Sequence, residues 1–392
     1  MSPTGKVTVR GRIEGLDGVR TVLHWIVVLT HLQLINQAGG WMAMQMFFLL
    51  SGFLISRVLL DLKLSHGLRR YFAEFLTFRF LRILPAYYAY LVALFAGAYL
   101  WAPDFFAQIS KVAAALFLFV FNYAWIWSEP VRTPWLGHLW SLAVEEQFYL
   151  LWPWLVWFTP LRRLPAVMLA IILAGPLFRA LTYFALEPFA HRIGSGGADA
   201  VYVAMPTYLD TFAMGGLLCF DDVRRRLARI PDRVFALAIL AALVAGLLWN
   251  FWASGGAAPD WATLGYPITM HAKKQFLWGY SVTGALLMVF LAKIVETGFA
   301  HRLLCIPILE RVGQVTYSLY LIHHGLILLM VLFTSWALAQ FHLAASWTAL
   351  LLYPAYAVVL YAVAFASFEW IEKPAMRLKQ RLFPRAAPRA AA

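Results

Sequence analysis

Ionisable side chains recur at helical spacing inside otherwise apolar stretches of this chain. In the first stretch, Arg20, His24 and His31 are separated by four and then seven positions. Asp17 lies one turn before Arg20. At about 100° per residue these side chains share one face of a helix whose other face is aliphatic and aromatic. Such a stripe is costly in hydrocarbon and indicates a wet or protein-lined interior suited to proton transfer or anion binding. For His24, a hydrogen-bonded packing role is the alternative.

A second polar stripe lies in the segment HLWSLAVEEQFYLLWP, which begins at His138. Ser141, Glu145 and Tyr149 recur every four residues and share a helix face, whereas Glu146 falls about 100° away from it. A carboxylate in a segment this apolar needs a partner, and we expect Glu145 to pair with a histidine or arginine of the first stripe. A purely structural buried ion pair is the alternative.

Arg79 and Arg82 are three residues apart where a third apolar stretch begins. Two guanidiniums on one helix face at a membrane surface suit phosphate, because each can bind it bidentately. Setting the topology, or binding anionic lipid headgroups, explains the spacing equally well. In the preceding stretch, Ser51 and Gly52 form a small pair that permits close helix packing, and we expect packing rather than nucleophilic chemistry at Ser51.

Toward the C-terminus, Tyr317, Tyr320 and His324 lie at positions i, i+3 and i+7 and form a third stripe. Glu369 and Glu372 then occupy the end of the last apolar stretch, just before a proline that stops the helix. We place this end in the cytoplasm, where Glu369 can anchor an arginine.

The elements that must position these residues are membrane helices. Of 392 residues, 62% are hydrophobic and 13% are charged, and the mean hydropathy is +0.71. A soluble protein of this length is far more polar. The formal charge of +13 does not indicate nucleic acid, because basic residues collect in the cytoplasmic loops of membrane proteins. Cys219 and Cys305 lack metal-type spacing, so we expect neither a metal site nor a disulfide framework.

Hydropathy divides the chain into eleven apolar stretches. They are residues 20–37, 41–61, 83–101, 111–127, 141–159, 164–185, 203–220, 234–251, 276–295, 315–338 and 346–371. Basic clusters place both termini in the cytoplasm, so the number of spans must be even. The stretch 111–127 must then begin and end on one side. The sequence predicts an all-α integral membrane bundle of about ten transmembrane helices plus one re-entrant or interfacial segment at 111–127.

One membrane domain accounts for nearly the whole chain. We expect residues 1–19 to form a cytoplasmic N-terminal segment without a cleavable signal peptide, 20–373 to form the transmembrane domain, and 374–392 to form a basic cytoplasmic tail. No internal repeat is evident, and no polar stretch is long enough to bury a core of its own. The chemistry is therefore expected inside the membrane or at its edge.

Taken in order, these motifs resemble those of the acyltransferase-3 family of integral-membrane O-acyltransferases. The resemblance covers roughly residues 13–380 and rests on GLDGVR with an Arg-x10-His pair, FFLLSGFLI, RFLRILP, HLWSLAVEEQFYLLWP, YSLYLIHH and FEWIEKP. The WSL-x-VEEQFYLLWP form is the most distinctive. One departure is His323-His324, where the family often has His-Trp, so which histidine matters stays open. The chain resembles the stand-alone members, which lack a fused extracytoplasmic esterase-like domain.

The resemblance implies a role for each matching residue. Arg20 and His31 match the family's Arg-x10-His pair, with His31 as the catalytic residue. The resemblance further implies catalysis with the help of Glu145 and Arg20, and donor binding by Arg79, Arg82 and Arg20. Trp140, Glu145 and Tyr149 match the family's Trp–Glu–Tyr block, and with these matches we expect an acceptor pocket lined by Trp140, Ser141, Tyr149, His24, Tyr317, Tyr320 and His324.

The implied reaction moves an acyl group, by default acetyl, from cytoplasmic acyl-coenzyme A to a carbohydrate hydroxyl, with no permanently bound cofactor. His31 would act as the base or carry the acyl group as an acyl-imidazole, and Glu145 would orient it. We expect a multi-pass protein of the bacterial inner membrane, whose partners are acyl-CoA, a surface or lipid-linked glycan and the bilayer. The alternatives are acylation of a secondary-metabolite glycoside, a proton-coupled transporter, and a non-catalytic scaffold or flippase partner.

Overall fold

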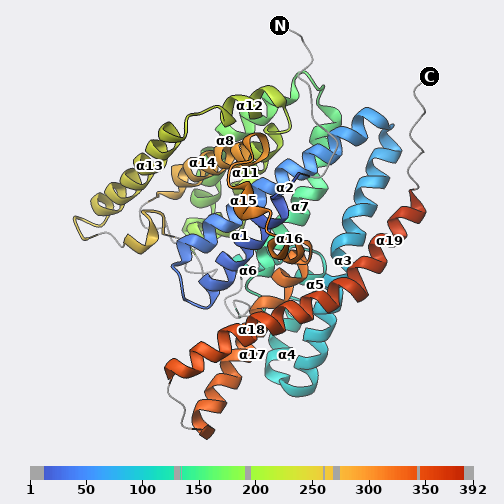
Figure 1. The fold of residues 1–392 in the computed structure, drawn as a ribbon, viewed down its shortest axis with the longest axis vertical. Helices are drawn as coiled ribbons and strands as arrows, with labels where there is room; N and C mark the ends of the chain where they lie inside the picture. Colours follow the sequence, from blue (N-terminus) through green and yellow to red (C-terminus); the bar gives the residue numbers. More distant parts are fainter. Residues whose placement is uncertain are drawn as a thin grey trace. The chain divides into compact units, whose positions relative to one another are not determined.

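A computed structural model gives the fold of the chain (Figure 1). It describes residues 13–127, 133, 135–189, 196–258, 261–267, 274–341 and 345–383. Within these ranges the regular structure is entirely helical, as predicted. The physical reason is that a long apolar run in lipid has to satisfy its backbone N–H and C=O groups within itself, which a helix does.

Seven of the described helices are long and apolar enough to cross a bilayer. They are α2 (Gln37–Ser65), α3 (Leu68–Trp101), α8 (Leu164–Leu186) with the turn after it to Phe189, α13 (Asp232–Ala253), α14 (Phe276–Thr297), α17 (Thr316–Phe341) over Thr316–Trp336, and α18 (Ala345–Ser367), whose candidate span runs from Leu352 through the following segments to Leu378. A multi-pass membrane protein is therefore supported. The total of ten spans and the cytoplasmic position of both termini stay predictions.

The remaining helices are shorter or more polar. They are α1 (Leu16–His31), α4 (Pro103–Ser110), α5 (Ala113–Phe117), α6 (Phe121–Trp127), α7 (Leu139–Phe158), α10 (Gly197–Val203), α11 (Leu209–Leu217), α12 (Asp221–Ala228), α15 (His301–Leu304), α16 (Pro307–Gln314) and α19 (Lys373–Leu382). The 3-10 turns are η2 (Glu187–Phe189), η3 (Met205–Tyr208) and η4 (Trp261–Thr263), and η5 (Phe368–Glu372) is a π-helix. The first two polar stripes lie on α1 and α7.

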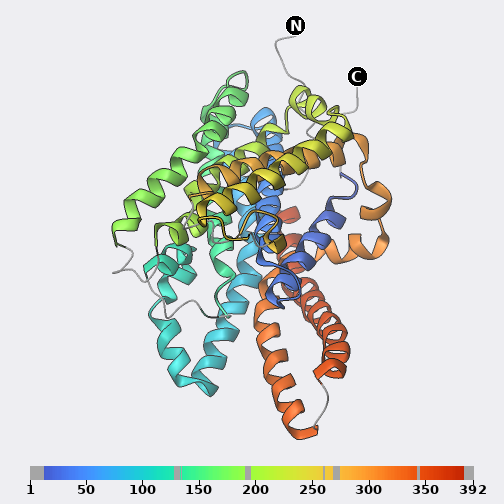
Figure 2. The ribbon, with the colours of Figure 1, turned by 90° about the vertical axis from the view of Figure 1, so that its left-hand side faces the viewer.

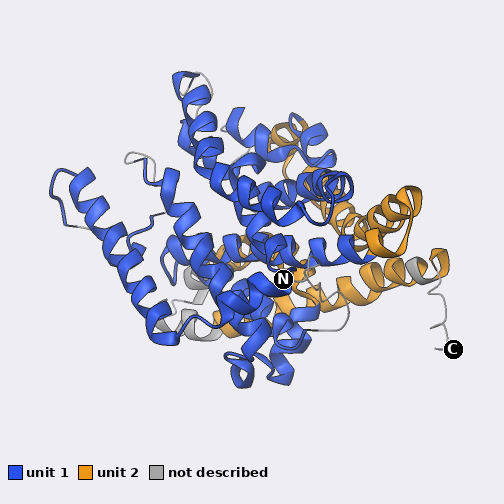
Figure 3. Cartoon of the chain, turned by 90° about the horizontal axis from the view of Figure 1, so that it is seen from above, with its two compact units in different colours: residues 1–61, 111–314 blue, residues 62–110, 315–392 orange. Residues whose placement is uncertain are grey.

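The chain forms two compact units (Figure 3). Unit 1 comprises residues 1–61 and 111–314, and unit 2 comprises residues 62–110 and 315–392. In unit 1, α8 packs against α10, α11 and α14, and α1 packs against α15 and α16. In unit 2, α19 packs against α3, and α17 packs along α18, as Figures 1 and 2 show. The residues expected to do chemistry are divided between the two units.

The stretch 111–127 is not one continuous helix. It forms α5 and α6, of five and seven residues, which are interrupted at Phe119 with φ +54°. Neither piece is long enough to cross a bilayer. The amide of Gln147 donates to the Phe119 carbonyl and to the Asn122 side chain, both at 2.8 Å. These bonds satisfy irregular backbone in the way that a membrane interior requires. The break supports a segment that does not span, and its sidedness stays a prediction.

The apolar stretch 203–220 is also divided, although hydropathy suggested a span. Helix α10 ends at Val203, Ala204 is extended with φ −78° and ψ 134°, and η3 then precedes α11. Pro206 lies at the start of η3, where its missing N–H disturbs no helical bond. Helix α11 has nine residues and is too short to span. Hydropathy records apolarity and does not register such a break.

Candidate active site

Three glycines allow α1 to lie directly against its neighbours. Gly15, at the N-cap of α1, has φ +81°, a conformation that favours glycine. A Cβ added to Gly18 would lie 1.9 Å from the carbonyl oxygen of Leu304 in α15. A Cβ added to Gly313 of α16 would lie 2.2 Å from the carbonyl oxygen of Asp17. The GLDGVR motif therefore packs backbone against backbone and in this way fixes the helix that carries the first stripe.

The first stripe lies on α1, with its charged residue near the start and its second imidazole at the end. Arg20 is half-buried, and its Nη1 lies 3.1 Å from Oδ1 of Asp17. His24 is fully buried. His31 is half-buried and is the last residue of the helix. Arg20 and His31 are thus about 16 Å apart along the helix axis, at 1.5 Å per residue.

The carboxylate of Glu145 accepts hydrogen bonds from two hydroxyl groups. The Ser51 hydroxyl of α2 and the Tyr149 hydroxyl, one turn further along α7, both donate to Oε1 of Glu145. Two donors on one oxygen fix the orientation of a carboxylate, and its second oxygen can still accept from another donor. Glu145 is half-buried, so a ligand hydroxyl can approach it. The sequence interpretation treated Ser51 as a packing residue and missed this contact.

The expected contact between Glu145 and the first stripe is not formed in this structure. Among the described residues, the partners of Glu145 are the two hydroxyls above. The course of α2 gives the reason. A Cβ added to Gly40 would lie 2.8 Å from Thr30, the neighbour of His31. Ser51 is eleven residues further along α2, which is about 16 Å. His31 and Glu145 therefore lie near points of α2 that are about 16 Å apart along the helix axis.

Trp140 and Ser141 begin α7 in different surroundings. Trp140 is buried, and its ring centroid lies 6.0 Å from that of Tyr208 at an interplanar angle of 28°. The ring of Tyr202 is 4.7 Å away from Trp140. The hydroxyl of Ser141 donates to the carbonyl of His138 at 2.9 Å, a bond that stabilises the start of the helix. Trp140 thus belongs to an aromatic cluster, and Ser141 supports the helix that positions Glu145.

In unit 2, the two arginines of α3 have different surroundings. Arg82 Nη1 lies 3.4 Å from Oε2 of Glu372. The guanidinium carbon of Arg79 lies 5.9 Å from the ring centroid of Phe75, one turn earlier on the same helix. Both arginines are at least partly exposed. They are thus held by neighbours while part of each side chain stays accessible, as binding of an anion requires.

The two adjacent histidines at the third stripe, His323 and His324, have different surroundings. His323 is fully buried, its Nδ1 lies 2.6 Å from the carbonyl of Tyr320, and its own carbonyl accepts from Tyr356 at 3.0 Å. His324 is half-buried, and its ring lies 5.6 Å from that of His323. The hydroxyl of Tyr317 donates to a backbone carbonyl of α3 at 2.9 Å. His323 is therefore a packing residue, and His324 is the histidine with accessible surface.

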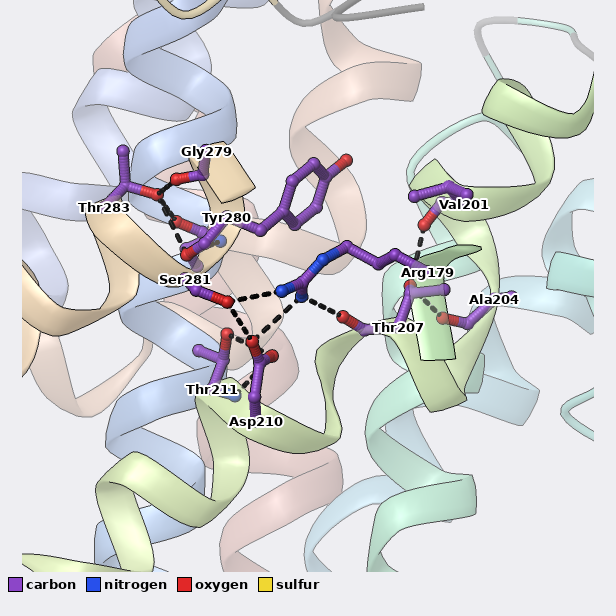
Figure 4. Close-up of polar contacts among 11 residues, drawn as sticks. Arg179, Val201, Ala204, Thr207, Asp210, Thr211, Gly279, Tyr280, Ser281 and Thr283 are labelled. Carbon is purple, nitrogen blue, oxygen red and sulfur yellow. Dashed lines mark hydrogen bonds and ion pairs between the residues drawn. The ribbon is translucent and has the colours of Figure 1, made fainter. Parts of the chain in front are cut away.

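Unit 1 also contains a buried ion pair that the sequence interpretation missed (Figure 4). Arg179 of α8 and Asp210 of α11 have no exposed side-chain surface, and Nη1 lies 2.9 Å from Oδ2. Ser281 of α14 accepts from Arg179 and donates to Asp210 at 3.0 Å. Arg179 also donates to the Thr207 carbonyl at 3.0 Å, and its guanidinium carbon lies 5.4 Å from the Tyr280 ring. Polar bonds thus tie three helices together.

A signal for this pair was present in the sequence. Arg179 is the one charged residue in α8, and Asp210 is the one charged residue in α11. An ionisable residue inside an apolar segment is expensive and needs a partner. Both were overlooked because they are isolated and do not recur at helical spacing. Ser51 had no comparable signal, because a serine beside a glycine is also the usual signature of close packing.

Residues 13–369 match the model of a family described as an acyltransferase domain. The match covers nearly the whole chain and contains the first two stripes and the arginine pair. The chain belongs to the acyltransferase-3 family. The acyltransferase match ends before Glu372, which lies just outside it.

Two curated relatives of this chain are O-acetyltransferases by name. O-acetyltransferase OatA of Staphylococcus aureus is 26% identical over 330 residues, which cover 80% of this chain and 50% of the relative. Peptidoglycan O-acetyltransferase OatA of Listeria monocytogenes is 31% identical over 183 residues, or 44% of this chain and 29% of the relative. The chain thus spans about half the length of the first relative. No solved structure matches this chain.

The two cysteines of the chain are free thiols. Cys219 is buried, with its sulfur 3.3 Å from the Phe53 carbonyl, and Cys305 is half-buried. In the part of the chain that the structure describes, no three His, Cys, Asp or Glu side chains are grouped so that they could hold a metal ion. The groups available to a substrate at this site are therefore imidazole, carboxylate, guanidinium and hydroxyl.

Proposed function

We propose that this chain is a membrane O-acyltransferase that moves an acyl group, most simply acetyl, from acyl-coenzyme A to a hydroxyl of a glycan. The observation that carries the proposal is the Glu145 carboxylate, held by the hydroxyls of Ser51 and Tyr149 in a chain of the acyltransferase-3 family. The names of the two relatives support acetyl as the group and peptidoglycan or another surface glycan as the acceptor. Their bacterial origin supports a bacterial inner membrane.

In the proposed reaction, the acceptor oxygen attacks the thioester carbonyl, so that a C–O bond forms and the C–S bond breaks. The acceptor proton passes to a base, and coenzyme A leaves as the thiolate, which takes up a proton. His31 is the proposed base, because a neutral imidazole has a ring nitrogen that can take the proton of the acceptor hydroxyl. Its transient acylation, with the acyl-imidazole then attacked by the acceptor, is the other route open to the same residue.

Glu145 is proposed to act on the acceptor. Because it meets α2 about 16 Å from the level of His31, we assign it to sugar hydroxyls rather than to orienting the imidazole. Oε1 is already occupied by Ser51 and Tyr149, and Oε2 can accept from the sugar. A glycan has several hydroxyl groups and is long enough to contact both residues. Trp140, packed in its aromatic cluster, stabilises the start of α7, the helix that carries Glu145.

The proposed donor site lies in unit 2, where Arg79 and Arg82 would bind phosphates of coenzyme A, and the donor role of Arg20 in unit 1 stays a prediction. Helix α3 has 34 residues and is about 51 Å long, more than the roughly 30 Å of a bilayer core. Its apolar part, residues 83–101, accounts for about 28 Å. The two α3 arginines therefore fall at the membrane surface, where a soluble nucleotide thioester can reach them.

The experiment is acyl transfer by the purified full chain in lipid nanodiscs, with radiolabelled acetyl-CoA and peptidoglycan fragments or surface polysaccharide as acceptors. We expect His31→Ala and Glu145→Gln each to lower transfer by about 100-fold or more, with unchanged thermal unfolding. Matched controls are His301→Ala and Glu14→Gln, which alter a partly exposed pair 2.9 Å apart and should keep full activity. Full activity in the His31 or Glu145 variant would remove that residue from the site.

A proton-coupled transporter is the second candidate, and the buried Arg179–Asp210 pair favours it. Buried ionisable pairs in helix bundles are typical of proton and substrate pathways. If the chain is a transporter, the reconstituted protein would move the glycan or a proton across the membrane without consuming the thioester. Release of free coenzyme A in step with glycan acylation would exclude this candidate.

A further inference from the structure

Glu372 is a buried carboxylate beside Arg82 in unit 2. Its side chain has no exposed surface, and Oε2 lies 3.4 Å from Nη1 of Arg82. The other oxygen, Oε1, accepts a hydrogen bond from Ser318 of α17. A buried carboxylate is tolerated only when its charge is paired and its oxygens are bonded. Glu372 is therefore fixed by a guanidinium from α3 and a hydroxyl from α17.

The backbone directs this carboxylate through an uncommon turn. Glu372 ends the π-helix η5, which joins α18 to α19. A π-turn adds a residue to the helical turn, changes the direction of the side chains beyond it, and is frequent at functional sites. Glu369, three residues earlier in the same turn, binds Nζ of Lys373 at 2.7 Å instead. Of the two carboxylates in FEWIEKP, Glu372 and not the expected Glu369 is the one that anchors an arginine.

Arg82 is held at several points but is not enclosed. Its guanidinium carbon lies 5.8 Å from the Phe368 ring centroid, and Nη1 lies 3.2 Å from the sulfur of Met376. Even so, the side chain is 30% exposed, whereas that of Glu372 is not exposed at all. Part of the Arg82 side chain thus stays accessible, while these contacts set the orientation of its guanidinium in advance.

We propose that Glu372 is a positioning residue for the acyl donor: it holds Arg82 so that the arginine's guanidinium meets a phosphate of coenzyme A. The inference rests on the proposed donor role of Arg82. A free arginine side chain loses rotamer entropy when a ligand fixes it. Glu372, which accepts a hydrogen bond from Ser318, has already ordered Arg82. Removing the Glu372 carboxylate should therefore weaken donor binding and leave the chemical step unchanged.

The test measures kcat and KM for acetyl-CoA with the full chain in nanodiscs. Glu372→Gln should raise KM about tenfold and leave kcat within about twofold, the pattern of a lost binding interaction. Ser318→Ala, which removes only the hydroxyl, should shift KM in the same direction by less. It also serves if Glu372→Gln does not fold. The matched control is Glu369→Gln, in the same turn but bound to Lys373, which should change neither constant.

Arg82→Ala and the double variant Arg82→Ala/Glu372→Gln separate the inference from the function on which it rests. If Glu372 acts through Arg82, the double variant should be no worse than Arg82→Ala alone. An unchanged KM in Arg82→Ala would overturn the donor role of Arg82. Two results would overturn the positioning role and leave the donor role of Arg82 in place. In both, Arg82→Ala raises KM. In the first, the effects of the two substitutions on KM are additive, and in the second, Glu372→Gln leaves KM unchanged or lowers it.

Discussion

Ser51 and Tyr149 donate to one oxygen of the Glu145 carboxylate from different helices. A carboxylate in this position could rotate about its terminal bond if a single donor held it. With two donors on Oε1, the plane of the carboxylate is set, and Oε2 has a defined direction. At the residue scale, the function of Glu145 therefore depends on a serine that has no acid–base chemistry of its own in the proposed reaction.

Replacing Ser51 tests this dependence. A hydrogen bond to a charged group contributes about 1.5–3 kcal/mol, so Ser51→Ala should lower acyl transfer about 10- to 100-fold. Ser51→Thr keeps the hydroxyl and should retain most of the rate. Steady-state transfer assays on purified protein measure both. Ser254→Ala is the control, because that hydroxyl bonds the Asn250 carbonyl at the end of α13. Equal rates in the alanine and threonine variants would show that the hydroxyl is not needed.

Helices α8, α11 and α14 meet at the Arg179–Asp210 pair, and the backbone is shaped around it. A Cβ added to Gly175 of α8 would lie 2.3 Å from Oδ2 of Asp210, so a glycine is needed there. Asp210 lies in the first turn of α11, and its Oδ1 accepts from the backbone N–H of Thr211 at 2.8 Å. A negative charge at this end also complements the helix dipole. At the element scale, the pair fixes how three helices pack.

Breaking this pair should destabilise the protein strongly. Arg179→Met leaves a buried carboxylate uncompensated, and Asp210→Asn leaves a buried guanidinium uncompensated, which costs about 3–5 kcal/mol in comparable cases. The double variant should lose less than the sum of the two single losses. Unfolding of the purified variants in detergent measures this. Arg70→Met is the control, because Arg70 pairs with Glu74 at 3.4 Å while half exposed, and such surface pairs contribute little. Additive losses would show that the two residues act separately.

In the proposed function, the chemistry of the whole molecule is distributed over both units. Unit 1 carries the first stripe and Glu145, whereas unit 2 carries Arg79, Arg82 and the third stripe. The membrane topology decides from which side each substrate reaches its residues. The broken segments 111–127 and 203–220 are the parts of the chain on which that topology depends, because a segment that does not span keeps the residues before and after it on one side.

Cysteine labelling in intact cells tests this topology. In a Cys305→Ala background, Asp104→Cys and Trp127→Cys, both at exposed positions, should react with a membrane-impermeant maleimide from outside. The native Cys219 is buried and should not react. Arg226→Cys, in the basic helix α12 that the positive-inside rule assigns to the cytoplasm, should react only after permeabilisation. Opposite sidedness of positions 104 and 127 would show that 111–127 crosses the membrane.

The sequence by itself determined the class of the protein, the family and the helices that carry most of the candidate residues. Composition and long apolar runs are sufficient for a helical membrane protein, and helical spacing placed Arg20, His31, Glu145 and Tyr149 on α1 and α7. These properties are local, because the period of a helix and the cost of charge in lipid act on each segment by itself. The order of the motifs then identified the family.

Only the tertiary structure decided which side chains meet. Ser51 and Glu145 are 94 positions apart, and the bonds from Glu372 to Arg82 and Ser318 join three separate segments of the chain. The breaks at Phe119 and around Pro206 likewise depend on neighbours that supply hydrogen bonds to irregular backbone. Such contacts follow from how helices pack, and a one-dimensional pattern of apolarity does not specify the rotation of one helix against another. For that physical reason, the partner expected for Glu145 was a histidine or arginine, and the partners observed are two hydroxyl groups.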